Sequence, residues 1–196
     1  MKLILGICGQ PCSGKDSVST YLVGDYKFTP ASTSDMIRFY ITEHNLGDLS
    51  KQDIQKTANS LRATHGADYL VSLALKNSAP RLVITGLRTP AEAALLKSAP
   101  GKLIALEAPV ELRYKRSLLR GRAGSNVTFE KFVEFERKES ESTDPNAQNV
   151  NAVISMADFK LQNVGTLEEL HQKIDILFSE ALSLNHSASV IRDIIA

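Results

Sequence analysis

The chain has 196 residues, of which 43% are hydrophobic and 23% are charged, with a formal net charge of +1. This length suits one sizeable domain and is too short for two ordinary ones, and the near-neutral charge argues against a dedicated nucleic-acid or membrane surface. No apolar run reaches transmembrane length, and MKLILGICGQ lacks the long apolar region of a signal peptide. Cys8 and Cys12 form neither a zinc set nor a disulfide scaffold, so we expect a cytoplasmic protein.

Strand-like and helix-like segments alternate along the chain. Nearly continuous apolar runs predict buried strands at 2–8, 81–87 and 102–108, and a last strand is expected at 158–164. Helices are expected after the first strand, after Pro90, after Pro109, and after Thr166 as the N-cap of an amphipathic stretch. Two further helical insertions are expected, one opening at Ser50 and a highly charged one at 128–142. The alternation predicts an α/β fold with a parallel sheet.

The stretch GQPCSGKDS, from Gly9 to Ser17, has the G-x-x-x-x-G-K spacing of a phosphate-binding loop (P-loop), with Gly14 and Lys15 in register. A glycine-rich turn between a strand and a helix exposes backbone N–H groups to an anion, and the helix N-terminus adds positive potential. Lys15 would supply a charge for the outer phosphates. The position after the lysine, commonly a hydroxyl for magnesium, is the acid Asp16, and Ser17 follows it.

Several segments resemble those of adenylate kinase and its relatives among the P-loop nucleotide (nucleoside monophosphate) kinases. GQPCSGKDS is similar to their G-x-P-G-x-G-K-G-T loop, STSDMIR (32–38) looks like their acceptor segment, and TGLRT (85–89) resembles their D-G-x-P-R-T segment. RSLLRGR (116–122) and FERKES (135–140) look like the two ends of a helical lid, and LRATHG (61–66) looks like an acceptor-domain helix. ADFKLQNVGTLEEL resembles the final strand, adenine-side loop and helix shared with dephospho-CoA kinases.

The resemblance implies a single P-loop kinase domain over residues 1–196, with an acceptor-binding insertion at about 33–78 and a lid at about 120–145. Its fold would be the P-loop NTPase three-layer sandwich around a five-stranded parallel sheet. ATP and Mg²⁺ would be the cofactors, and small-molecule nucleotides the substrates. The oligomeric state stays open.

The resemblance also implies site residues. Those expected to bind the donor nucleotide are Gly9, Pro11, Cys12, Ser13, Gly14, Lys15, Asp16, Ser17, Arg116, Asn163 and Gly165. Those expected to bind the acceptor are Thr33, Asp35, Arg38, Arg62, Gly86 and Arg88. The residues expected to act in catalysis are Lys15, Arg88, Arg120 and Arg122, and those expected at magnesium, directly or through water, are Asp16 and Ser17.

Three functions stay open on the sequence. The first is transfer of a phosphoryl group from ATP to a nucleoside monophosphate, with AMP as the default acceptor. The second is a dephospho-CoA-kinase-like activity, and the third is a nucleotide-binding regulatory protein with weak or lost catalysis. The third is favoured by Thr85, which stands at the end of a strand that should carry the Walker B acid.

Two side chains near the loop have competing interpretations. Asp16 either replaces the missing acid beside the metal, facing Thr85, or only stabilises the helix N-terminus. Arg113 shares a helix face with Arg116 and Arg120, and we expect it on a solvated basic face with a partner such as Glu111.

Overall fold

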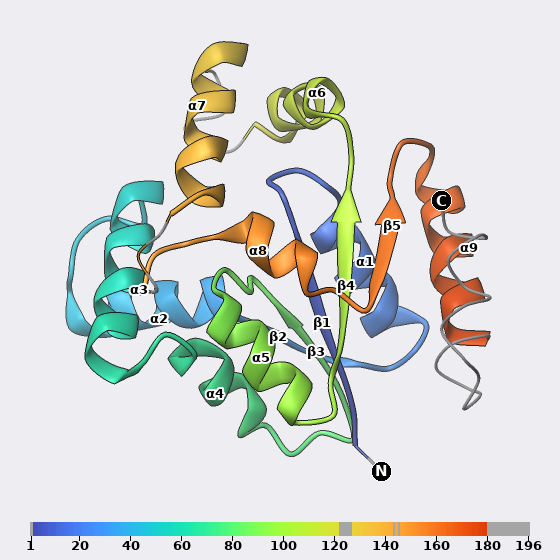
Figure 1. The fold of residues 1–196 in the computed structure, drawn as a ribbon, viewed down its shortest axis with the longest axis horizontal. Coiled ribbons are helices and arrows are strands. Elements are labelled where there is room, and N and C mark those ends of the chain that lie inside the picture. The colour runs from blue at the N-terminus through green and yellow to red at the C-terminus, as the bar shows by residue number, and fades with distance from the viewer. Residues whose placement is uncertain (1, 122–126, 143, 145, 180–196) are drawn as a thin grey trace.

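The computed structural model describes residues 2–121, 127–142, 144 and 146–179. A five-stranded, all-parallel sheet with the order β2-β3-β1-β4-β5 forms its centre (Figure 1). The strands are β1 Leu3–Gly9, β2 Thr29–Ser32, β3 Arg81–Thr85, β4 Lys102–Glu107 and β5 Phe159–Gln162. The predicted α/β fold with a five-stranded parallel sheet is confirmed.

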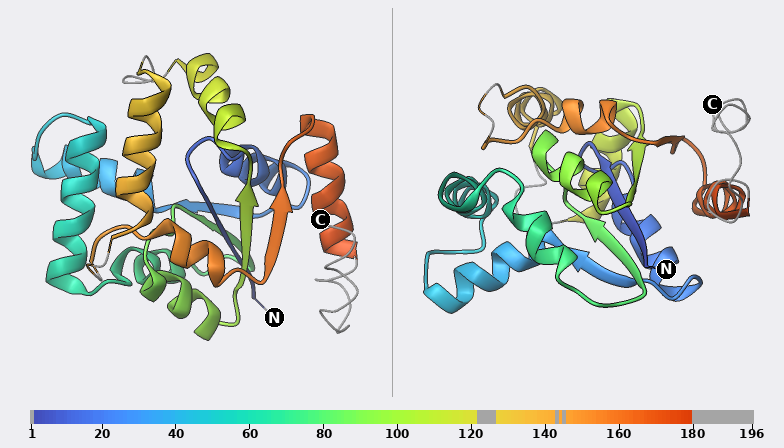
Figure 2. Two further views of the ribbon diagram at one scale, coloured as in Figure 1. Left: turned by 45° about the horizontal axis from the view of Figure 1, so that its top comes forward. Right: turned by 60° about the horizontal axis from the view of Figure 1, so that its bottom comes forward.

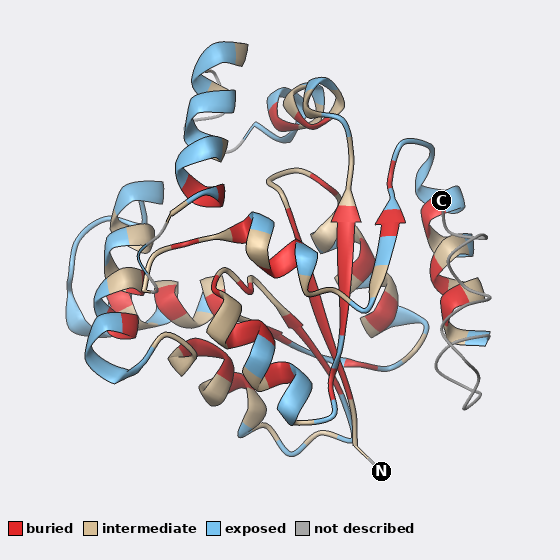
Figure 3. Ribbon diagram, in the orientation of Figure 1, coloured by how far each residue is buried: buried red, intermediate tan, exposed pale blue. Residues whose placement is uncertain are grey.

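Helices cover both faces of the sheet, which gives three layers. The helices are α1 Lys15–Gly24, α2 Thr33–His44, α3 Lys51–His65, α4 Tyr69–Leu75, α5 Pro90–Ser98, α6 Val110–Arg120, α7 Phe129–Ser140, α8 Val150–Ser155 and α9 Leu167–Leu177. Because alternate residues of a strand point to opposite faces, Leu5 and Ile7 pack against α1 and α9, whereas Ile4 and Cys8 pack toward α4, α5 and α8. Buried positions accordingly follow the central strands and the inner sides of these helices (Figure 3).

The helices α6 and α7 stand above the carboxyl ends of the strands, as Figure 1 and the left view of Figure 2 show. Helices α2 and α3 lie beside the same end and share a small core with Tyr69 and Leu70 of α4. In parallel α/β sheets, ligands bind outside the carboxyl ends of the strands. The fold therefore brings the P-loop, α6, α7 and the start of α2 together at the carboxyl ends of the strands.

The strand β2 had no counterpart among the strand segments predicted from the sequence. It has four residues, includes Pro30, and pairs with β3 at the edge of the sheet. Proline lacks an N–H donor and is confined to edge positions, so the segment carries little of the usual strand pattern. The strand β3 also ends two residues earlier than predicted, because Gly86 turns the chain with φ +89°.

Thr166 and Ser50 cap helices as predicted, and Thr89 is a further cap that the sequence analysis did not name. Thr89 and Thr166 each form a full capping box with a glutamate three residues later, Glu92 and Glu169. The Ser50 side chain accepts a hydrogen bond from the Asp53 N–H at the start of α3. Such caps satisfy N–H groups that the first turn of a helix leaves without partners.

A buried ion pair joins α3 to α5. The guanidinium of Arg62 donates to Glu92 Oε1 from Nε at 3.0 Å and from Nη2 at 2.9 Å, and the two side chains are 1% and 0% exposed. The second oxygen of Glu92 accepts from the N–H groups of Arg88 and Thr89. Arg62, expected among the acceptor residues, thus lies inside the fold, and its Nη1 has no hydrogen-bond partner among the described residues.

Arg62→Met should lower the free energy of unfolding by about 3–5 kcal/mol, because it leaves the Glu92 carboxylate buried without its cation. Arg62→Met combined with Glu92→Gln should recover much of this loss, since the amide oxygen still accepts from the two N–H groups. Urea denaturation measures both. A loss below about 1 kcal/mol in the single variant would contradict the structural role of the pair.

Candidate functional site

The loop between β1 and α1 has the backbone of a phosphate cradle. Gly9 and Gly14 have φ of +139° and +106°, and Cys12 has φ 60°. A Cβ at Gly9 would collide with the carbonyl oxygen of Leu106, and one at Gly14 with the Asn163 amide, so both positions require glycine. As the N-cap of α1, Gly14 contributes no capping side chain. The first amides of α1 can therefore bind an anion.

Asn163 fastens this loop to the opposite side of the site. Its side chain is buried, donates to the Ser13 carbonyl at 2.8 Å, and accepts from Arg116 Nη2 at 3.3 Å. Two donors next to these contacts, Arg116 Nη1 and Ser13 Oγ, stay buried without partners among the described residues. Buried polar groups are normally paired, so these two point to a ligand with acceptor oxygens.

A cavity of about 550 Å³ opens over the P-loop, between α6 and the β5–α9 connection. It is lined by Cys12, Gly14, Lys15, Asp16, Ser17, Arg116, Leu119, Arg120, Asn163, Gly165, Leu167 and Leu170. Most of these were predicted to bind the donor nucleotide, and the structure brings them together. The sequence analysis missed Leu119 and Leu167, which are 88% and 56% exposed. Their only signal in the sequence is that apolar residues sit beside the expected lid and adenine-side segments.

Asp16 has a partner that neither interpretation of the sequence included. Its carboxylate pairs with Arg120 Nη2 at the end of α6, so the pair joins the P-loop side of the cavity to the α6 side. Both side chains are partly exposed, and pairs of this kind contribute little to stability. Thr85 lies at the end of β3, in register with Ile7 and Ser32. Arg122, expected to act in catalysis, lies outside the described residues.

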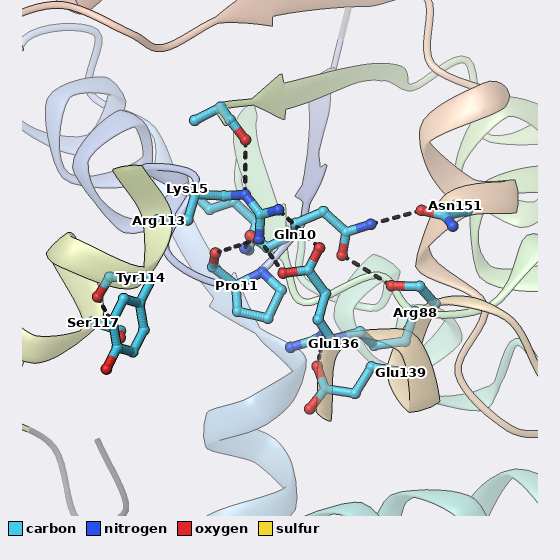
Figure 4. A network of polar contacts seen from close by, with 12 residues as sticks. Gln10, Pro11, Lys15, Arg88, Arg113, Tyr114, Ser117, Glu136, Glu139 and Asn151 are labelled. Atoms are coloured by element: carbon cyan, nitrogen blue, oxygen red, sulfur yellow. Dashed lines mark hydrogen bonds and ion pairs between the residues drawn. The ribbon is translucent and has the colours of Figure 1, made fainter. Parts of the chain in front are cut away.

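Lys15 belongs to a polar network above the P-loop (Figure 4). Its Nζ donates to the Gln10 carbonyl at 2.6 Å. Burial, and next the positive charge of Arg88, lower the pKa of Lys15 to about 8. The Gln10 side chain in turn donates to Asn151 and accepts from Ser140, the last residue of α7. The P-loop lysine is therefore connected to α7 through Gln10.

Arg88 points to a buried carboxylate. Its Nη1 lies 3.2 Å from Glu139 Oε2, and Lys51 Nζ lies 2.7 Å from Glu139 Oε1 (Figure 4 labels Arg88 and Glu139). Burial raises the pKa of Glu139, but Arg88 and Lys51 outweigh it, so that the pKa lies below its usual value. The sequence analysis missed Glu139 and Lys51, because a glutamate in a charged helix and a lysine at a helix start have the pattern of solvated surface.

The remaining acceptor candidates lie at the start of α2 and after β3. Thr33 is buried and donates to the Gly86 carbonyl at 2.9 Å, and a Cβ at Gly86 would collide with its hydroxyl. Arg38 lies one turn further along α2 and pairs with Asp35 at 2.7 Å. Thr33 and Gly86 thus join the two segments, whereas Arg38 and Asp35 lie on the exposed side of α2.

The expectation of a solvated Arg113 is wrong. Its side chain is 5% exposed, forms a two-point ion pair with Glu136 of α7, and donates to the carbonyls of Ala108 and Pro11. The reason is that its partner comes from α7, 23 positions away in sequence, and not from Glu111 on its own helix. Arg113 therefore connects α6, α7 and the P-loop (Figure 4).

The lowered pKa of Lys15 predicts that phosphate binding at the loop depends on pH. Near pH 7 the amine is mostly protonated, and near pH 9 it is mostly neutral. ATP phosphates are largely ionised over this range, since the last pKa of such a phosphate is about 6. We expect ATP affinity to fall about tenfold between these pH values, with about half a proton taken up per ATP bound at pH 8 and close to one proton at about pH 9. Isothermal titration calorimetry in two buffers measures both effects.

Lys15→Arg is the matched control, because a guanidinium stays charged throughout this pH range. Its ATP affinity, whatever its absolute value, should vary far less with pH. An equal pH dependence in this variant would contradict the assignment of the titration to Lys15.

Curated relatives of the chain include a UPF0200 protein from Thermococcus gammatolerans, 28% identical over 193 residues, which cover 92% of this chain and 96% of the relative. A UPF0200 protein from Methanocaldococcus jannaschii is 26% identical over 188 residues, covering 92% of this chain and 91% of the relative. A UPF0200/UPF0201 protein from Archaeoglobus fulgidus is 27% identical over 180 residues, 87% of this chain, and this chain spans about half of its length (53%).

Solved structures with the same fold include TT1252 from Thermus thermophilus, at 19% identity and a TM-score of 0.58, with 92% of this chain and 98% of that chain covered. Shikimate kinase from Aquifex aeolicus is 17% identical with a TM-score of 0.54, covering 92% and 99% of the two chains. These likenesses establish a P-loop kinase-like fold.

Across the described residues, no helix is both long and apolar enough to cross a membrane.

One family model matches residues 5–144, which include the P-loop, α2, the turn after β3 and both α6 and α7. Because this match covers well over half of the chain, and the loop that it includes has the geometry of a phosphate cradle, the chain belongs to the AAA_18 family of AAA domains.

Proposed function

We propose that this protein transfers a phosphoryl group from ATP to a small acceptor that carries a phosphate, a nucleoside monophosphate with AMP as the default. The observation that carries the proposal is that Lys15 in the P-loop and Arg88 after β3 are both tied to the end of α7, Lys15 through Gln10 and Ser140 and Arg88 through Glu139. Phosphoryl transfer needs positive charge on both sides of the transferred group and little covalent help. Lys15 and Arg88 supply this charge from the donor side and the acceptor side.

The donor side of the site suits a nucleoside triphosphate. The first amides of α1 and Lys15 would bind the phosphates, and Arg116 has a buried donor atom still available among the described residues. Leu119 and Leu167, on the wall of the cavity, would flank the base. Asn163 would hold Arg116 in a fixed position relative to the P-loop through its two hydrogen bonds.

Magnesium fits this side through few protein ligands. The described residues contain no group of three or more His, Cys, Asp or Glu side chains placed to hold a metal ion. Ser17 would offer its hydroxyl, and Asp16 a carboxylate through water, while Asp16 also pairs with Arg120. Magnesium keeps several waters and relies on substrate phosphates, so these two residues suffice. When bound, the ion would offset charge on the donor phosphates.

The acceptor side would be formed by Arg88, with Arg38 on α2 contributing from the exposed side. Charge-assisted contacts from these guanidinium groups would hold the acceptor phosphate. Arg120, at the end of α6, would exchange Asp16 for phosphate oxygens and help to exclude water. The Thr33–Gly86 contact would keep the two acceptor segments together.

A regulatory nucleotide-binding protein is the second candidate, and a specific observation favours it. The strand β3 ends in Thr85, so the acid expected beside the metal is missing from that strand. A protein of this kind would bind ATP at the same P-loop and show no acceptor-dependent turnover.

An acceptor panel tests the proposal. The full chain is incubated with ATP, magnesium and one candidate acceptor at a time: AMP, the other nucleoside monophosphates, or dephospho-CoA. We expect ADP formation that depends on the acceptor and is greatest with AMP. Preference for dephospho-CoA would instead favour a dephospho-CoA-kinase-like activity. ATP binding without turnover would favour the regulatory protein.

Lys15→Ala should abolish this turnover without lowering thermal stability, because the folded protein already disfavours the charged lysine through burial and Arg88. The readouts are initial rate and melting temperature. Turnover equal to that of the unmodified protein would exclude the P-loop as the donor site.

Arg88→Ala should weaken binding of the acceptor by about 1.5–3 kcal/mol, the usual contribution of a hydrogen bond to a charged group. It should affect ATP affinity much less. Arg81→Ala is the matched control, because Arg81 begins β3 at the opposite end of the strand and donates to the Tyr26 carbonyl. Calorimetry gives the two affinities. Loss of ATP affinity with unchanged acceptor affinity would place Arg88 on the donor side.

A further inference from the structure

Glu139 is an acid in a region that otherwise gathers positive charge. Its side chain is 5% exposed and lies within ion-pair distance of Arg88 and Lys51, and Lys15 is near enough to influence it. A buried charge is costly unless it is paired. Without Glu139, the cations themselves would be left facing one another with no anion between them.

Lys51 is placed against the usual preference of helices. It is the first residue of α3, where the helix dipole disfavours a cation. Its side chain is 61% exposed, yet its ammonium lies 2.7 Å from Glu139. A long, exposed lysine held at a helix start beside Arg88 provides a second cation at the acceptor end.

We propose that Lys51 and Arg88 together form the subsite for the acceptor's phosphate, and that the carboxylate of Glu139 occupies this subsite until the phosphate replaces it. The identity of the acceptor rests on the proposed function, whereas the anion subsite itself does not. Lys51 contributes a point charge and Arg88 a planar fork that can bind two oxygens.

The charges favour the replacement. Lys15, Arg88 and Lys51 carry three positive charges and Glu139 one negative charge, so the cluster keeps an excess of positive charge. A phosphate monoester carries close to two negative charges near neutral pH and offers more oxygens than a carboxylate. Glu139 lies in the last turn of α7, one residue before its end, where few helical hydrogen bonds must change for the side chain to leave.

The test uses the full chain and inorganic phosphate as the probe, titrated by calorimetry. Glu139→Gln removes the competing charge, so phosphate affinity should rise by about tenfold, and Lys51→Gln should lower it by a similar factor. In the double variant most of the gain should be lost. Glu134→Gln is the matched control, because Glu134 lies on the same helix, is half exposed and pairs with Lys138; its phosphate affinity should stay within about twofold.

Unchanged or weaker phosphate binding in Glu139→Gln would overturn the inference, as would a gain that persists in full when Lys51 is also replaced. If Glu139→Gln loses its folded circular dichroism spectrum, Lys51→Gln decides alone, since Lys51 is exposed: unchanged affinity there also overturns the inference. If the acceptor panel shows no turnover but the Glu139 and Lys51 variants change phosphate affinity as expected, only the proposed function is refuted. If turnover depends on the acceptor but the variants do not change phosphate affinity as expected, only the subsite is refuted.

Discussion

Positive charges that gather at the carboxyl ends of the strands repel one another, and several of the arginines are each paired with an acid from a different element. This pairing is what holds the helices above the sheet against the P-loop. It differs from a surface salt-bridge pattern because several of the partners are almost fully buried. The pairs are Arg62–Glu92, Arg88–Glu139, Arg113–Glu136 and Arg120–Asp16.

The pairs differ in what they can contribute. Arg62 and Glu92 are sealed inside the fold and fix the turn that carries Arg88, so they set the position of a candidate ligand-binding side chain without contacting a ligand. Arg120 and Asp16 are partly exposed across an open cavity, and water weakens their attraction. Burial thus separates a permanent framework from pairs that ligand charges can replace. Glu139 lies between these extremes, because it is buried but has two cationic partners from separate elements.

The sequence predicted the features that depend on neighbouring residues and missed those that depend on residues far apart in the chain. The P-loop and the capped helices are local patterns, and Gly14, Lys15 and Thr166 are where the sequence places them. Short apolar runs likewise predicted three strands, and a fourth was expected at 158–164; the last three of these four strands are shorter than predicted. Arg113 and Glu139 were outside this reach, because their burial depends on partners from elements distant in the chain. A charged helix pattern cannot by itself distinguish solvent from a buried partner.

The edge strand β2 has a consequence for how molecules of this protein meet one another. An exposed strand edge offers N–H and C=O groups to which a strand of another molecule can pair, and this is a route to aggregation. Pro30 removes one donor from β2, and the strand has only four residues. The opposite edge, β5, is equally short and carries the exposed Lys160. The features that weaken the strand pattern of Thr29–Ser32 in the sequence therefore also make the β2 edge a poor template for intermolecular pairing, and the shortness of β5 and its Lys160 do the same at the other edge.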